Sequence, residues 1–248
     1  MIQKIIFVLF IVIQPIVVCA QESYIKLLAG LSKPPFVMAE EGKGMQVDII
    51  EAAFAKSNKF VRFTYLPINR HLDVFHNREF DGIITLDSHE KEWGIYLSQP
   101  YIIYQNVVVT LIDSKIKPDN INELADFKVA AFQNATRFLG ESYKAVFKHS
   151  ANYTELADQQ SQISLLFSGR VDAVIMDVNI FKHLLAIKRQ EETNTGIYNK
   201  AYEVHFLFNP RAYTAGFKSK ELSQQFDLGI KAIMADGSYQ QIIDSYLQ

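Results

Sequence analysis

Apolar and polar positions follow two rhythms along the first part of the chain. Residues 25–31 form a short apolar run, and 61–65 place an apolar side chain at every other position, so both stretches predict strands. Between them Val47, Ile50 and Phe54 recur at helical spacing. Because strands and helices alternate, the pattern predicts an α/β fold with a largely parallel sheet.

The alternation continues to the end of the chain in two series. A helix around Leu72 and Phe75 and a strand at 81–84 complete the first series, and a β-rich run at 102–112 leaves it. The second series has predicted strands at 128–132, 171–176 and 204–208, helices from about 136 and at 163–167, and two final amphipathic helices marked by Leu222, Phe226, Ile230, Ile233, Ile242, Ile243 and Tyr246. Two series predict two lobes, with a crevice suited to a small ligand between them.

The first 20 residues have a different pattern. Lys4 is the one early charge, an unbroken apolar run covers 5–13, and the stretch ends Val18-Cys19-Ala20. This order is typical of a secretory signal peptide cleaved after Ala20, since a membrane span needs about 20 mostly apolar residues. Two alternatives stay open: an uncleaved N-terminal anchor, and a lipoprotein processed at Cys19, which Val18 disfavours.

Charge and cysteine content narrow the function. The 248 residues carry 25 basic and 27 acidic side chains, and cleavage removes Lys4, leaving 24 against 27. This balance gives no hint of nucleic-acid binding, which needs a basic stripe. Cys19 is the only cysteine, so the mature chain would contain neither thiol nor disulfide.

The sequence contains no recognisable catalytic or metal-binding motif. Its histidines stand at 71, 76, 89, 149, 183 and 205, with no pair at i, i+4 spacing. It has no Gly-x-Ser-x-Gly, phosphate loop or Gly-x-Gly-x-x-Gly. Carboxylate pairs at 40–41 and 191–192 lie in polar surroundings typical of a solvated surface. We therefore expect no enzyme activity, no metal site and no cofactor.

A set of short motifs stands in order along the chain: KPPF at 33–36, GMQVDII at 44–50, FDGII at 80–84, LSQPY at 97–101, LADFKV at 124–129 followed by QNAT at 133–136, SGRVDAVIMD at 168–177, and ADGSY at 235–239. Together they resemble the extracellular solute-binding proteins of family 3, the polar amino-acid type served by ABC importers. The resemblance implies the type II periplasmic-binding fold, an α/β fold of two lobes joined by two hinge strands. Lobe 1 would comprise 21–103 plus 211–248, and lobe 2 would comprise 104–210.

The resemblance also implies a function. The protein would be a monomeric periplasmic protein that captures a small polar ligand, an amino acid or a related amine or carboxylate, and delivers it to an ABC permease in the inner membrane. Two alternatives stay open: a periplasmic dehydratase of the cyclohexadienyl type on the same fold, and a ligand-sensing module for a receptor.

In lobe 2, two residues are candidates for holding opposite ends of a zwitterion. Asp177 follows the buried strand at 171–176, at the strand end where α/β proteins bind ligands, and by resemblance it would pair with an amine. Thr136, with the amides after Asn134, begins a helix whose free donors favour an anion. The alternative for both residues is an ordinary helix cap.

Lobe 1 departs from the family. Where the family presents Thr-x-x-Arg to grip a carboxylate, this chain has Ser88-His89-Glu90-Lys91, and lysine lacks the planar fork of arginine. Arg70 resembles an arginine that reaches the cleft in one branch of the family, the alternative being a solvated helix end. Candidates for aromatic walls are Phe36, Tyr65, Trp93, Tyr101 and Phe132.

Overall fold

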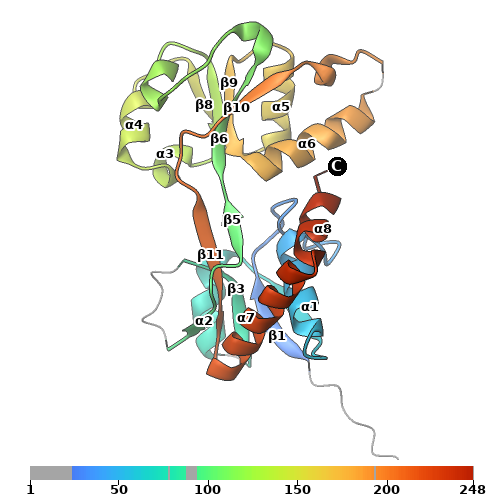
Figure 1. Cartoon of the computed structure of the whole chain (residues 1–248). Coiled ribbons are helices and arrows are strands. Elements are labelled where there is room, and N and C mark those ends of the chain that lie inside the picture. The colour runs from blue at the N-terminus through green and yellow to red at the C-terminus, as the bar shows by residue number, and fades with distance from the viewer. Residues whose placement is uncertain (1–23, 78, 88–93, 193, 248) are drawn as a thin grey trace, which may run out of the picture.

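The computed structural model describes residues 24–77, 79–87, 94–192 and 194–247. Figure 1 shows two α/β lobes, one at each end of the molecule, with strands β5 (Ile102–Tyr104) and β11 (Arg211–Phe217) running between them. The two strands pair antiparallel. The two-lobed α/β fold expected from the sequence is confirmed, while the lobe boundaries at 103/104 and 210/211 stay predictions.

The sheet of lobe 1 is mixed, with the order β2 (Val61–Tyr65), β1 (Ile25–Ala29), β3 (Gly82–Leu86), β11 and β4 (Tyr96–Leu97). Strand β1 runs parallel to β2 and β3, whereas β11 runs antiparallel to β3 and β4. Strands β1 and β3 consist mostly of consecutive apolar residues. They are almost wholly buried, as is typical of strands covered on both faces of a sheet.

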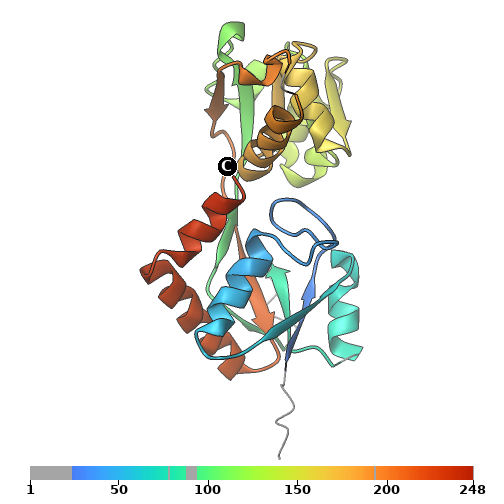
Figure 2. The same cartoon turned by 90° about the vertical axis from the view of Figure 1, so that its right-hand side faces the viewer.

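The helices of lobe 1 come from both ends of the chain: α1 (Met45–Ala55), η1 (Ile68–Arg70), α2 (His71–Asn77), α7 (Lys220–Ala235) and α8 (Ser238–Ser245). Figure 2 shows α1 and α7 on neighbouring sides of this lobe. Helix α7 approaches α1 so closely that a Cβ on Gly229 would lie 2.1 Å from the Ala53 carbonyl oxygen. Glycine is therefore required there for α7 to pack against α1.

The sheet of lobe 2 has the order β10 (Tyr202–His205), β6 (Asn106–Leu111), β9 (Ala173–Asp177), β7 (Val129–Phe132) and β8 (Tyr153–Leu156). Strands β7, β8 and β9 are parallel, and β6 and β10 are antiparallel to their neighbours. The helices are α3 (Ala135–Phe138), α4 (Glu141–Phe147), α5 (Gln159–Phe167) and α6 (Val178–Glu191), with short 3-10 helices η3 (Ile112–Ser114), η4 (Ile121–Leu124) and η5 (Ile197–Asn199).

Strands β4, β8 and β11 and helix α4 are absent from the expectation drawn from the hydrophobic pattern. Strand β8 is a sheet edge of four residues, none of them fully buried, and β11 contains Gly216 and an irregular register between Thr214 and Gly216. Neither gives a clean alternation. The antiparallel β11, β6 and β10 make both sheets mixed, where a largely parallel sheet was expected.

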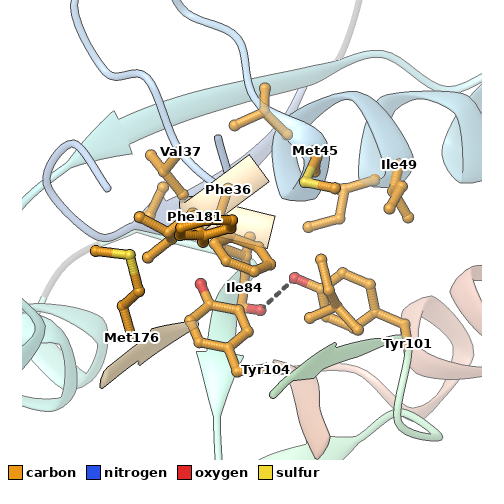
Figure 3. Packing of buried hydrophobic residues seen from close by; sticks show 14 of the residues in the cluster. Phe36, Val37, Met45, Ile49, Ile84, Tyr101, Tyr104, Met176 and Phe181 are labelled. Carbon is orange, nitrogen blue, oxygen red and sulfur yellow. Dashed lines mark hydrogen bonds between the residues drawn. The ribbon is translucent and has the colours of Figure 1, made fainter. Parts of the chain in front are cut away.

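One buried apolar cluster continues from lobe 1 into lobe 2. Figure 3 shows Phe36 of lobe 1 beside Phe181 and Met176 of lobe 2, with Tyr104 below them. All three apolar side chains are fully buried. The lobes thus share packing near the connecting strands. No helix of the described residues is both long and apolar enough to cross a membrane.

Candidate ligand-binding site

The carboxyl ends of the parallel strands in each lobe face the other lobe. In lobe 2, β6 follows the connecting strand directly, and its first residue, Asn106, pairs with Asp177 at the end of β9. In lobe 1, β11 arrives from lobe 2 and pairs Thr214 with Leu86 at the end of β3. Since carboxyl ends of strands are where α/β proteins bind ligands, the space between these two edges is the candidate site.

Asp177 caps helix α6 and is almost fully covered. Its carboxylate accepts backbone hydrogen bonds from Asn179 (2.8 Å), Ile180 (3.2 Å) and Gln105 (2.7 Å), and the residue is 3% exposed. Burial raises its pKa, while these N–H donors and the charge of Lys33 oppose the rise. The capping role inferred from the sequence is thus present, and the ligand role stays a prediction.

Thr136 does not offer free donors, because Glu155 of β8 occupies them. The Glu155 carboxylate accepts from the Thr136 amide and hydroxyl, both at 2.8 Å, and from the Asn134 amide at 2.7 Å. The Tyr153 hydroxyl adds a fourth hydrogen bond at 2.9 Å. The anion site expected at the start of α3 therefore already contains an anion, which belongs to the protein. We call Glu155, Asp177 and the ends of β7, β8 and β9 the lobe 2 rim.

Across from the lobe 2 rim lies a group from lobe 1 and the connecting strand, Lys33, Phe36 and Tyr104, which we call the lobe 1 floor. The Phe36 and Tyr104 rings stack with centroids 3.9 Å apart, and the Lys33 ammonium lies 4.3 Å from the Tyr104 centroid, within cation–π range. The loop is fixed by Gly44, with φ 129°, where a Cβ would lie 2.5 Å from the Phe36 carbonyl oxygen.

Lys33 is the cation of the lobe 1 floor. Its residue surface is open to solvent, yet enough protein surrounds the ammonium to lower its pKa, and only the negative charge of Asp177 opposes that shift. A cation from lobe 1 and an anion from lobe 2 thus interact across the site.

A buried polar network supports the lobe 1 floor from below. The Gln46 amide donates to the Tyr101 hydroxyl (2.9 Å) and to Thr85 Oγ1 (3.1 Å), and its oxygen accepts from the Tyr104 hydroxyl (2.9 Å). Tyr101 in turn donates to the Ile84 carbonyl at 2.7 Å, the dashed line of Figure 3. Burial raises the pKa of both tyrosines, so both stay neutral donors.

The remaining predicted site residues are placed as follows. Phe36 and Tyr101 are buried, at 0% and 2% exposure, so neither ring has open surface for a ligand here. Tyr65 and Phe132 are half-buried at the ends of β2 and β7, on the two facing edges. Arg70 ends η1 and is exposed. Lys91 and Trp93 lie outside the described residues.

The sequence reasoning missed several residues that build this site: Lys33, Gln46, Tyr104, Tyr153 and Glu155. Lys33 carried a signal, as the charged residue of the Lys33-Pro34-Pro35-Phe36 motif. Glu155 carried none, because its contact with Thr136 depends on the register of β8 against β7, where Glu155 lies opposite Ala131.

A hollow of about 500 Å³ lies elsewhere, between α6 and the C-terminal segment. It is lined by Lys182, Leu185, Ala186, Arg189, Gln190, Tyr202, Asp244 and Leu247, and it contains none of the predicted site residues. Nearby, His183 Nδ1 lies 2.9 Å from the Tyr246 carbonyl oxygen. No group of three or more metal-ligating side chains occurs among the described residues.

Two α/β lobes, two connecting strands, and strand ends that face each other across a charged site define a two-lobed ligand-binding protein. Residues 25–248 match the family described as bacterial extracellular solute-binding proteins, family 3, and the chain belongs to that family. The resemblance drawn from the sequence motifs is thereby confirmed.

Individual relatives agree with this assignment. An arginine-binding periplasmic protein of Mannheimia haemolytica is 26% identical over 223 residues, which cover 87% of this chain and 88% of the relative. An ancestral cationic amino acid solute-binding protein has a similar fold, with TM-score 0.68 and 16% identity over 91% of this chain and 96% of that one. A polar amino acid ABC uptake transporter substrate-binding protein of Streptococcus thermophilus gives TM-score 0.68 and 17% identity over 90% and 86%.

Proposed function

We propose that this family 3 protein captures a small, amine-bearing polar ligand between its lobes and delivers it to an ABC permease. The observation that carries the proposal is the charged site between the facing strand ends, where Asp177 of lobe 2 interacts with Lys33 of lobe 1. One relative is named as an arginine-binding protein, which supports a ligand that carries an amine or guanidine group.

Capture follows from contacts shared between lobes. Asp177 would pair with the ligand cation, and Arg70 and Lys91 would pair with an anionic group if the ligand has one. Tyr65 and Phe132, at the ends of β2 and β7, would cover it from both sides, and the buried Phe36 and Tyr101 would support the site without touching the ligand. A ligand that touches both lobes stabilises the arrangement that makes all contacts at once.

The test is a thermal-shift screen of the purified protein with amino acids, amines and small carboxylates. A binder at about 100 times its Kd stabilises the folded state by about 2.7 kcal/mol, which is readily seen. Small-angle scattering with and without the binder then measures closure of the lobes. If the whole library leaves the melting temperature unchanged, the proposal is wrong about the ligand class.

We further propose that binding is not followed by chemistry. The family is one of solute-binding proteins, and Asp177, the buried carboxylate of the site, is engaged by three backbone donors. Incubation with prephenate or arogenate should leave both compounds unchanged. Product formation that is lost on changing Asp177 or Glu155 would instead support a dehydratase.

Export and oligomeric state belong to the same proposal. A signal peptide cleaved after Ala20 would place the mature chain in the periplasm, consistent with an extracellular family, and a monomer would suffice for binding. Intact mass after periplasmic extraction locates the cleavage, and light scattering measures the oligomeric state. A mass that includes residues 1–20, or a lipid on Cys19, would replace cleavage by an anchor.

A further inference from the structure

Glu155 belongs to β8, the edge strand beside β7, and β7 leads into α3 with Thr136. Strand β9, which ends at Asp177, lies on the other side of β7. Strands β7, β8 and β9 are parallel, so their carboxyl ends lie on the edge of the lobe 2 sheet that faces lobe 1. Glu155 stands opposite Ala131, one residue before the end of β7. Its carboxylate is thus part of the lobe 2 rim rather than of a remote surface.

The hydrogen bonds of Glu155 use three donors at the start of α3, the backbone amides of Asn134 and Thr136 and the Thr136 hydroxyl. Its Oε1 accepts from the Thr136 amide, the Thr136 hydroxyl and the Tyr153 hydroxyl, and its Oε2 accepts from the Asn134 amide. Tyr153 is itself held by the Tyr143 hydroxyl at 3.0 Å. Donors to a charged carboxylate are roughly twice as strong as neutral ones, so this is a firmly held side chain.

These contacts keep the carboxylate ionised. Partial burial favours the neutral acid, but the hydrogen bonds from Thr136, Tyr153 and Asn134 outweigh burial and lower the pKa of Glu155. A ligand carboxylate could reach the same donors only by displacing Glu155, which would lose its hydrogen bonds and stand beside a second negative charge.

The lobe 2 rim therefore carries two carboxylates, Glu155 and Asp177, and the Asn134 and Thr136 donors at the start of α3 are already bonded to one of them. We propose that Glu155 is a specificity-determining residue: it fills the donor site at the start of α3 with an internal anion, so that the protein selects amines or guanidines lacking a carboxylate at that position. This inference rests on the proposed function, because it concerns the ligand of the same site.

Matched pairs of compounds test it directly. The purified protein is titrated by calorimetry with arginine and agmatine, and with lysine and cadaverine, which differ only in the carboxylate. We expect the wild type to bind the decarboxylated member more tightly, by about tenfold or more. Glu155→Ala frees the donors, so the preference should shift toward the amino acid by at least about tenfold.

Two further variants separate the causes. In Glu155→Gln the amide oxygen still accepts from Thr136 while the charge is lost, so amines should weaken without a matching gain for amino acids. Glu141→Ala removes an exposed glutamate whose ion pair with Lys144 lies on α4, and it should leave the preference unchanged. If Glu155→Ala does not fold, Glu155→Gln still measures how the loss of the negative charge changes the preference between amine and amino acid.

The outcomes distinguish this inference from the function beneath it. Wild-type protein that binds arginine or lysine more tightly than the decarboxylated partner would overturn the role of Glu155 and leave the proposed function standing. The same holds for an unchanged preference in Glu155→Ala. A folded protein that binds neither member of any pair would overturn both.

Discussion

The two sides of the site are built by different means. The lobe 1 floor is an aromatic stack above a buried network of side-chain hydrogen bonds centred on Gln46. The lobe 2 rim consists of two carboxylates held by backbone amides at strand ends and helix starts. One side depends on packing for its shape, and the other depends on main-chain geometry for its charge.

Stability and ligand selectivity should therefore depend on different sides of the site. Side chains of the lobe 1 floor are shared with the apolar cluster that joins the lobes, so changes there should be felt mainly in folding. The lobe 2 rim holds its carboxylates mainly through backbone hydrogen bonds, so changes there should be felt mainly in which ligand binds.

The largest effect is expected for Asp177. Asp177→Ala should weaken amine binding by about 2–5 kcal/mol if the carboxylate meets a buried cation, and should destabilise the fold by about 1 kcal/mol through the lost cap. Asp177→Asn keeps an oxygen for Asn179 and Ile180 and removes the charge, but its NH2 group cannot accept the Gln105 N–H. Affinity should therefore fall strongly, and the fold should lose about 1 kcal/mol through the unpaired N–H. Calorimetry and urea denaturation measure the two quantities. Unchanged affinity in Asp177→Asn would leave capping as its only role.

The next effect is on the lobe 1 floor. Gln46 is 1% exposed and bonded to Thr85, Tyr101 and Tyr104. In Gln46→Leu the new side chain has a similar volume but leaves buried hydroxyl groups without their partner. The free energy of unfolding should therefore fall by about 2–4 kcal/mol. Urea denaturation gives the value. A loss of affinity with stability intact would show that the floor contributes to recognition rather than to folding.

A smaller effect should follow removal of the cation in the lobe 1 floor. Lys33→Met keeps an unbranched side chain over Tyr104 but removes a charge that interacts with Asp177. Amines should bind more tightly by about 1 kcal/mol, since they no longer compete with Lys33 for Asp177. Calorimetry at low and high salt measures this, because screening should shrink the gain. Weaker amine binding would mean that Lys33 assists rather than competes.

The smallest effects should appear in the pH dependence of stability, and they have opposite signs. Burial raises the pKa of Asp177 above its usual 3.8, so its folded state prefers the proton and the stability of wild type over Asp177→Asn should fall as pH rises through that region. Glu155 has a pKa below its usual 4.5, so its contribution is present above that value and lost as pH falls.

Urea denaturation from about pH 3 to about pH 7 would measure both differences. As pH rises, the free energy of unfolding of the wild type should increase relative to that of Glu155→Gln and decrease relative to that of Asp177→Asn. Parallel curves for the two variants would show that the two carboxylates experience the same environment, against the distinction drawn from their burial and donors.

Most of the fold could be predicted because its central strands and amphipathic helices have clear periods. Val47, Ile50 and Phe54 lie in α1 as expected, and 171–176 corresponds closely to β9. The motifs then supplied the family, which residues 25–248 confirm. Strand β11 escaped the pattern because its residues alternate poorly around Gly216.

The site was less predictable because its chemistry depends on pairs distant in sequence. Asp177 could be identified as a cap and as a carboxylate at a strand end from local sequence alone. That Thr136 is bonded to Glu155 requires the register of two strands, and that Lys33 lies over Tyr104 requires the loop and the connecting strand together. No local pattern contains either fact.

Strand β11 has a consequence for the order in which the molecule can be assembled. It lies between β3 and β4, inside the lobe 1 sheet, yet it is made after the whole of lobe 2. Until Arg211–Phe217 emerges, β3 has no neighbour on one side and the N-terminal third of the chain cannot complete a sheet. Lobe 1 therefore cannot finish folding until late in synthesis, a delay that suits the export proposed above.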